Sequence, residues 1–426
     1  MRLILLIQSC WLLACLIWPA APQSARRLWV LREPDEIVEY DAVSFAPKGR
    51  IRVPSAAIQN PERLSINGRG QMLFVPGTTG DEDDFRPGSA PNRVWFWNGR
   101  TSVQLDRGAT RKRSRAGENL SVEETLPACL LSADGLHLFW FENEFRKLQG
   151  SEGVPDLSVT TVCRVWQSDL AGGQRRKIVE VTFAPCKCGT GVCSETCPEA
   201  ELWAPDGVID DFFLLTHWIP GQLGATFQNS FLHRKGKGNW VGSKLPGPLE
   251  NLLDAARGGD ILLSALPDTG CCGWDNDSND RTLVIRGGTA TVLFDERERY
   301  ANPNYDVSFF TSRALLSPDL ASAAMTVVSS ARPEGEIRLS YGGKPDSREL
   351  ARIRQSVSSL PAVEACRLDN PSRRTASVPN AALAGWLNSQ EILILENQVL
   401  VGFNTASGTR RDPKIGAPRI SQVFLR

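Results

Sequence analysis

The sequence has no excess of charge of either sign. Its 426 residues carry 48 Lys and Arg against 48 Asp and Glu, so the formal net charge is zero. A neutral chain exerts no broad attraction on nucleic acid or anionic lipid, and we expect no nucleic-acid partner. With 42% hydrophobic and 23% charged residues, the composition is that of an ordinary folded protein, which excludes the disordered and collagen-like classes.

Histidine and catalytic motifs are scarce as well. The only histidines are His137, His217 and His233, and neither His-Glu-x-x-His nor Gly-x-Ser-x-Gly occurs. His137 alternates with apolar residues, which is typical of a half-buried strand position rather than a ligand. The 48 acidic residues offer too many pairs to single out a general acid and base. We therefore assign no catalytic residue and favour a protein that is not an enzyme, leaving that question open.

Long apolar runs are absent apart from residues 3–18, LILLIQSCWLLACLIW. Their position behind Arg2 and before a stretch of small and turn residues predicts a signal peptide over residues 1–25, followed by one domain over residues 26–426. An uncleaved N-terminal anchor and a lipoprotein modified at Cys15 are the alternatives. The favoured interpretation predicts a periplasmic or secreted protein with no membrane span after signal cleavage.

Cysteine, by contrast, is well represented, with 11 residues in the chain. The densest group is 186-CKCGTGVCSETC-197, whose four cysteines are Cys186, Cys188, Cys193 and Cys197. This spacing differs from the paired Cys-x2-Cys knuckles of zinc sites, so in an oxidising compartment we favour local disulfides over metal binding or redox exchange. Cys129 and Cys163 are expected on the first and third strands of one sheet, too far apart to bridge, and Cys366 is the candidate for an unpaired thiol.

A second polar segment, 270-GCCGWDNDSNDRT-282, alternates oxygen-bearing side chains in the manner of a calcium loop. The candidate ligands are Asp275, Asp277, Asn279 and Asp280. An aspartate stands where the turn glycine belongs and Arg286 stands at the twelfth position, so a polar hairpin tip is the favoured interpretation. We expect no cofactor, with calcium as the one left open. Cys271 and Cys272 are disulfide candidates beside Trp274, which such a linkage would hold toward a ligand.

The most regular feature is a short turn sequence that recurs between apolar runs. In its full form it pairs Ser or Pro with Asp or Asn, often followed by Gly, a combination that closes a tight turn between two strands. The copies at residues 204–207, 256–259 and 386–389 are weaker and lack some of these residues. We call these turns anchors; they begin at Leu64, Leu131, Ala204, Ala256, Leu316 and Trp386. Recurrence at intervals of about 50–75 residues between short strands indicates a β-propeller or a similar array.

The two ends of the chain supply the remaining strands. Residues 28–54 predict three strands without an anchor, and residues 419–426 predict a single strand without neighbours. Pairing these segments removes two exposed sheet edges, so six anchored sheets and one composite sheet predict seven blades, with six as the alternative. We also expect a strand at 336–341 and long inter-strand loops at 77–92, 107–118 and 184–200.

These turns resemble the Ser-Pro-Asp-Gly turns of the TolB-like and WD40-like exported bacterial β-propellers, most clearly at residues 64–68, 131–135 and 316–319 and in the closing segment 384–408. The resemblance implies an all-β propeller, a fold used for binding platforms, envelope assemblies and enzyme scaffolds alike. We accordingly expect a non-catalytic binding module for a protein or glycan partner, with Trp240 and Trp274 as ligand-facing aromatic candidates. The alternative is a hydrolase or lyase with an acidic or calcium-dependent site.

Overall fold

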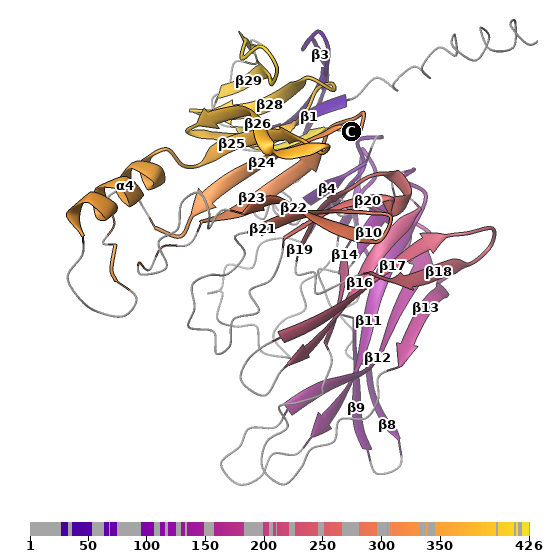
Figure 1. Ribbon diagram of the computed structural model, residues 1–426. Coiled ribbons are helices and arrows are strands. Elements are labelled where there is room, and N and C mark those ends of the chain that lie inside the picture. The colour runs from indigo at the N-terminus through magenta and orange to yellow at the C-terminus, as the bar shows by residue number, and fades with distance from the viewer. Residues whose placement is uncertain are drawn as a thin grey trace, which may run out of the picture.

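The computed structural model describes most strands of the domain and the turns between them. The described residues are 27–32, 36–52, 64–67, 69–74, 95–105, 111–115, 118–124, 129–132, 134–148, 157–182, 199–203, 208–209, 211–220, 226–245, 251–265, 281–295, 305, 307, 309–331, 335, 337–339, 346–397, 399–412, 415 and 420–425. Seven sheets follow one another along the chain and form a ring (Figure 1). Their described strand pairs are antiparallel except that of β10 (Leu130–Ser132) with β15 (Val208–Ile209), which is parallel. The protein is a seven-bladed β-propeller.

Blade 1 is composite, as the sequence predicts. Its strands, from the inner edge outward, are β31 (Ile420–Leu425), β1 (Arg27–Arg32), β2 (Glu36–Asp41) and β3 (Pro47–Arg52). The register pairs Leu28 with Leu425 and Val30 with Val423, so the last strand of the chain closes the ring against the first.

The other six blades each run outward in chain order from an inner strand. Blade 2 contains β4 (Leu64–Ile66), β5 (Met72–Phe74), β6 (Trp95–Trp97) and β7 (Ser102–Gln104). Blade 3 contains β10 (Leu130–Ser132), β11 (Leu138–Leu148), β12 (Leu157–Ser168) and β13 (Arg176–Thr182). Blade 4 contains β14 (Glu199–Trp203), β16 (Phe212–Pro220), β17 (Thr226–Lys235) and β18 (Trp240–Lys244).

Blades 5 to 7 repeat this arrangement. Blade 5 contains β19 (Asn251–Ala255), β20 (Ile261–Ala265), β21 (Arg281–Arg286) and β22 (Thr289–Asp295). Blade 6 contains β23 (Phe309–Leu316), β24 (Ser322–Ser329), β25 (Ala362–Arg367) and β26 (Asn370–Pro379). Blade 7 contains β27 (Ala381–Trp386), β28 (Glu391–Glu396), β29 (Val399–Asn404) and β30 (Arg410–Arg411).

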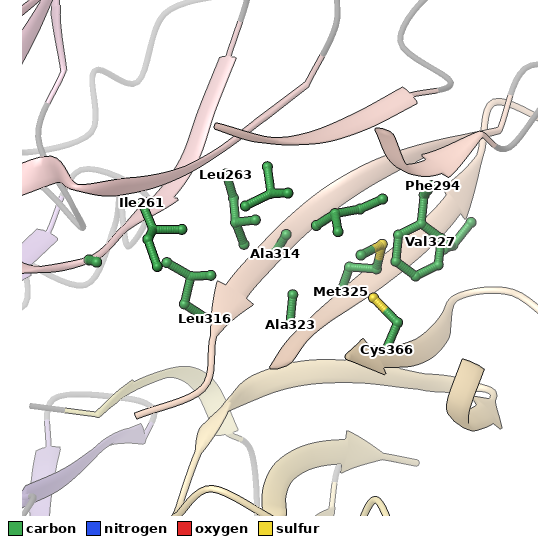
Figure 2. Packing of buried hydrophobic residues seen from close by; sticks show 12 residues of the cluster. Ile261, Leu263, Phe294, Ala314, Leu316, Ala323, Met325, Val327 and Cys366 are labelled. Atoms are coloured by element: carbon green, nitrogen blue, oxygen red, sulfur yellow. The ribbon is translucent and has the colours of Figure 1, made fainter. Parts of the chain in front are cut away.

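The core is divided among the seven interfaces between neighbouring blades. Successive residues of a strand point to opposite faces of the sheet, and in each blade both faces are buried. In β11, for example, Leu138 and Trp140 pack toward blade 2, whereas Phe139 and Phe141 pack toward blade 4. Figure 2 shows the interface of blades 5 and 6, where Leu263 and Phe294 of blade 5 belong to the same buried cluster as Met325 of blade 6. Burial on both faces explains why the second strands are continuous apolar runs.

Three segments depart from the sequence-based expectations. Residues 107–118, expected to be a loop, contain strand β8 (Arg111–Arg115) and the start of β9 (Glu118–Glu124), which extends the sheet of blade 3 along β11. The prediction of a strand at 336–341 is wrong for the described residues of this segment, because Leu339 forms only an isolated bridge with Tyr305. The third departure is a helix, α4 (Ser347–Ser358), between β24 and β25.

Helix α4 stands clear of the sheets in Figure 1 and has a small core of its own. Ile353 and Val357 of the helix are buried against Tyr305, Val307 and Phe309, which precede or begin β23. The helix is thus packed on a satellite cluster rather than on the main inter-blade core, and no propeller repeat predicts it.

Candidate functional site: the insertion face

The two ends of the ring differ in the length of their connections. One end, here called the turn face, carries the six anchors and the connections from third to fourth strands, which are short where the structure describes them. The anchor that begins at Ala204 lies outside the described residues and is followed by the short strand β15 (Val208–Ile209). The other end, the insertion face, carries every connection from second to third strands and from one blade to the next. The β8–β9 hairpin and helix α4 both belong to connections of this second kind.

On the turn face, polar side chains bond to their own backbone. Asn67 accepts hydrogen bonds from the amides of Arg69 and Gln71 at 2.9 and 3.0 Å. The same local pattern recurs in the other turns, at Asp41, Asn98, Asp134, Asp169, Asp319, Asn388 and Asn404. These oxygen atoms serve as turn-forming groups, as expected for Asx turns.

Two anchors each contain a further hydrogen bond between side chains. Ser132 donates its hydroxyl to Asp134 Oδ1 at 2.6 Å, and Ser317 does the same to Asp319 at 2.6 Å. Partial burial opposes ionisation of both carboxyls, but the serine hydroxyl and a backbone amide hold the pKa of each below its ordinary value. Serine and aspartate two residues apart are therefore structural parts of the turn, not a catalytic pair.

On the insertion side, blade 3 has the longest strands that the structure describes. Strands β11 and β12 have 11 and 12 residues. Figure 1 shows them extending together with the β8–β9 hairpin. The hairpin pairs with β11 and so adds two strands to blade 3 at this face.

Blade 3 also carries an ion network, centred on Arg164 of β12. Its guanidinium donates to Glu180 at 2.8 Å, to Glu142 at 3.0 Å and to Glu144 at 3.1 Å. The three glutamates come from β11 and β13 on either side of β12, and Lys177 adds a second cation at 2.9 Å from Glu180. Lys177 and Arg164 lower the pKa of Glu180. The ion pairs hold Glu180 in its charged form, so its carboxylate is a fixed part of this network rather than a proton donor.

The metal and disulfide candidates lie outside the described residues. These are Asp275, Asp277, Asn279, Asp280, Cys271, Cys272, Trp274, Cys186, Cys188, Cys193 and Cys197. The described strands that flank them end at the insertion face: Thr182 ends β13, while Ala265 and Arg281 bound β20 and β21. Both segments therefore leave and rejoin the ring at that face. Within the described ranges, no group of three His, Cys, Asp or Glu side chains is placed to hold a metal ion.

The remaining candidate residues are Trp240 and two histidines, of which Trp240 lies at the interface of two blades. Trp240 is half-buried, with its ring centroid 4.9 Å from that of Phe213 and 6.1 Å from that of Phe139. His137 is half-buried and directly precedes Leu138, the first residue of β11. The side chain of His217 lies outside the described part of the chain. Trp240 thus helps to join blades 3 and 4.

Three cysteines are buried, Cys129, Cys163 and Cys366, and the thiols of Cys163 and Cys366 are free. Strand β11 separates Cys129 from Cys163, in agreement with the expected arrangement. Burial raises the pKa of Cys163 to about 12 and that of Cys366 to about 11. Thiols of this kind stay protonated and act as small apolar side chains.

Sequence analysis missed the Arg164 network and helix α4. The network depends on cross-strand register, which the sequence does not display. The helix had a visible signal, because Leu350, Ile353 and Val357 are spaced by three and four residues behind Asp346, a good N-cap residue. None of the helices in the described residues is long and apolar enough to cross a bilayer.

Comparison with known proteins identifies no relative in sequence. No family model matches the chain, and no curated protein matches it significantly. Solved structures match at low identity. A post-proline cleaving enzyme from Rickettsia typhi has a TM-score of 0.43 and 8% identity over 93% of this chain and 52% of that one, so this chain spans about half of its length.

Two further matches have similar statistics. Apo AztD from Citrobacter koseri has a TM-score of 0.38 and 10% identity, covering 94% of this chain and 98% of that one. The WD40 domain of SCAP from fission yeast has a TM-score of 0.31 and 7% identity, covering 88% and 78%. The matches include an enzyme and a WD40 domain, and at such identity they select no activity.

Proposed function

We propose that this chain is an exported, non-catalytic binding module that engages a protein or glycan partner through its insertion face. The observation that carries the proposal is the contrast between the two ends of the ring. The turn face consists of short connections whose polar atoms bond to their own backbone, whereas the extended strands, the β8–β9 hairpin and helix α4 all belong to the insertion face. Binding residues concentrate on loops and extensions that a rigid scaffold positions.

The chemistry of the described groups favours binding over catalysis. The carboxylates around Arg164 are held by cations, and the thiols of Cys163 and Cys366 are buried with raised pKa values. Export rests on the apolar segment at residues 3–18, and the TolB-like side of the sequence resemblance agrees with an envelope location.

A second candidate is a calcium-dependent site for a partner or for hydrolase or lyase chemistry. It is favoured by the alternating oxygen ligands at residues 275–280, whose flanking strands β20 and β21 end at the insertion face. This candidate uses the same face, so one experiment addresses both.

Site-specific photo-crosslinking tests the proposal. A benzophenone amino acid is placed at three exposed positions of the insertion face, Arg52, Thr182 and Lys244, and the protein is irradiated in an extract of the cells that produce it. Matched turn-face controls are Leu136, Ala171 and Ser407, which are equally exposed. We expect adducts of discrete mass from the insertion face alone.

Adducts from the turn face alone, or from neither face, would overturn the proposal. Repeating the irradiation with a chelator distinguishes the two candidates, because only a calcium-dependent site loses its adduct when calcium is removed.

A further inference from the structure

Helix α4 is mounted rigidly on the insertion side of blade 6. The Asp346 side chain caps its first turn by accepting from the amides of Arg348 and Glu349. The Tyr305 hydroxyl donates to the Asp346 carbonyl at 3.3 Å and accepts from the Asp346 amide at 3.1 Å. With Ile353 and Val357 buried below, the position of the opposite helix face is fixed.

That opposite face carries two arginines that have no side-chain partner among the described residues. Arg348 and Arg352 are one helical turn apart on the same line, whereas Arg354 follows Arg352 by two residues and therefore lies on another side of the helix. All three side chains are exposed, and none forms an ion pair or a hydrogen bond through its guanidinium with a described residue. Elsewhere on the surface Arg367 and Arg410 each have a carboxylate partner, at 2.7 and 3.2 Å.

The stability of the helix does not account for these arginines. A cation in the first turn, where Arg348 stands, is opposed by the positive end of the helix dipole. Like charges four residues apart, as in Arg348 and Arg352, also destabilise a helix. Glu349, also in the first turn, is favourable there and stands three residues before Arg352. Arg348 itself has no stabilising role at its position in the helix, as expected of a residue that makes a contact outside the chain.

We propose that Arg348 and Arg352 form a docking surface for an acidic, carboxylate-rich segment of a protein partner, and that Arg354, on another side of the helix, adds to the positive charge around it. This inference rests on the proposed function and names the chemistry of its partner. Guanidinium groups bind carboxylates through paired N–H donors, and two of them on one line fit successive acidic side chains of a peptide.

The burial of the helix argues for a peptide rather than a membrane. A helix that lies in a bilayer surface inserts its apolar face between the lipids. In α4 that face is occupied by the satellite cluster, since Ile353 is 4% and Val357 is 1% exposed. Only the charged side is left for a partner.

Binding of a fluorescent six-glutamate peptide tests the docking surface. Anisotropy is measured in about 50 mM salt, where screening is modest, with the wild-type protein and the triple variant R348E/R352E/R354E. The matched control is R69E/R100E/R286E, which makes the same charge change at exposed arginines of the turn face. We expect affinity to fall about tenfold or more in the α4 variant and to stay within about twofold in the control.

Several results would overturn the inference. These are equal losses in both variants, no binding by the wild-type protein, or binding to vesicles of anionic phosphatidylglycerol in place of the peptide. Circular dichroism and thermal unfolding verify that the α4 variant is folded, and R348Q/R352Q/R354Q replaces it if it is not. The photo-crosslinking positions lie outside α4. Adducts at Thr182 or Lys244 without peptide binding would therefore contradict the docking surface but not the proposed function.

Discussion

His233 is a buried histidine whose ring forms no hydrogen bond with the described part of the chain. It is 8% exposed, and neither ring nitrogen has a hydrogen-bond partner among the described residues. Its ring stacks on Phe213 at 5.0 Å between centroids, inside the interface of blades 3 and 4. Burial lowers the pKa of His233 from 6.5 to about 4. The residue is therefore neutral in the folded protein at any pH above that value.

This burial predicts a loss of stability in mild acid. Between pH 6.5 and 4 the unfolded chain binds a proton at His233 that the folded chain does not, so the free energy of unfolding falls as pH falls. The shift corresponds to about 3 kcal/mol at most. We expect His233→Phe, which preserves the ring stacking, to remove this part of the pH dependence. Urea unfolding at pH 7.5 and 4.5 measures it, and an unchanged difference between the two pH values in the variant would contradict the assignment.

At the scale of elements, the anchors also join neighbouring blades. Asp254 of blade 5 accepts from the amide of Leu316 in blade 6 at 2.7 Å, and Trp386 of blade 7 donates to the carbonyl of Leu315 at 3.0 Å. The sequence shows each anchor as a local turn, because its residues are adjacent in the chain. Its second role involves residues about 60–70 positions away, which only the ring brings together.

The outer edge of blades 5 and 6 is joined by a buried ion pair. The Glu364 side chain is fully buried and accepts from Arg374 Nε at 3.0 Å. Arg374 also donates to the carbonyl of Leu293 in blade 5, and its guanidinium lies 3.3 Å from the ring centroid of Phe294. One arginine thus connects β25, β26 and β22.

Removing this arginine should destabilise the protein strongly. We expect Arg374→Met to lower the free energy of unfolding by about 3–5 kcal/mol, because the Glu364 carboxylate is left buried without its cation. The double variant Glu364→Met/Arg374→Met should recover much of that loss, since no charge remains to be desolvated. Denaturant unfolding of the two variants decides the matter: a double variant no more stable than Arg374→Met would show that packing, not charge, is responsible.

The elements that sequence analysis missed share a physical cause. Residues 111–115, RKRSR, have the composition of a solvated loop, yet they form β8 because β9 supplies a complete backbone ladder. Strand formation there depends on pairing rather than on residue type. The repeat pattern predicts strands alone, so it does not predict the helix around Ile353, which lies in a connection between two strands. What the sequence predicted well were the features that recur, namely the anchors and the alternation of two buried faces.

For the whole molecule, the composite blade determines where the chain enters and leaves the ring. Strand β31 ends at the turn face, and β1, its antiparallel neighbour, begins there at Arg27. Whatever becomes of residues 1–25, the described domain is therefore joined to them at the turn face. The insertion face, with α4, lies at the other end of the ring from that attachment, where a partner can approach it.

Closure by β31 also predicts how the ring responds to truncation. A protein ending at residue 418 lacks the inner strand of blade 1, which leaves the edge of β1 unpaired and the interface of blades 1 and 7 open around Leu28 and Val30. We expect the midpoint of thermal unfolding to fall by about 10 °C or more and the protein to self-associate in sedimentation. A peptide of residues 419–426 added in trans should restore both, whereas a scrambled peptide should not. A truncated protein that unfolds at the wild-type temperature as a monomer would show that the seven blades do not depend on this closure.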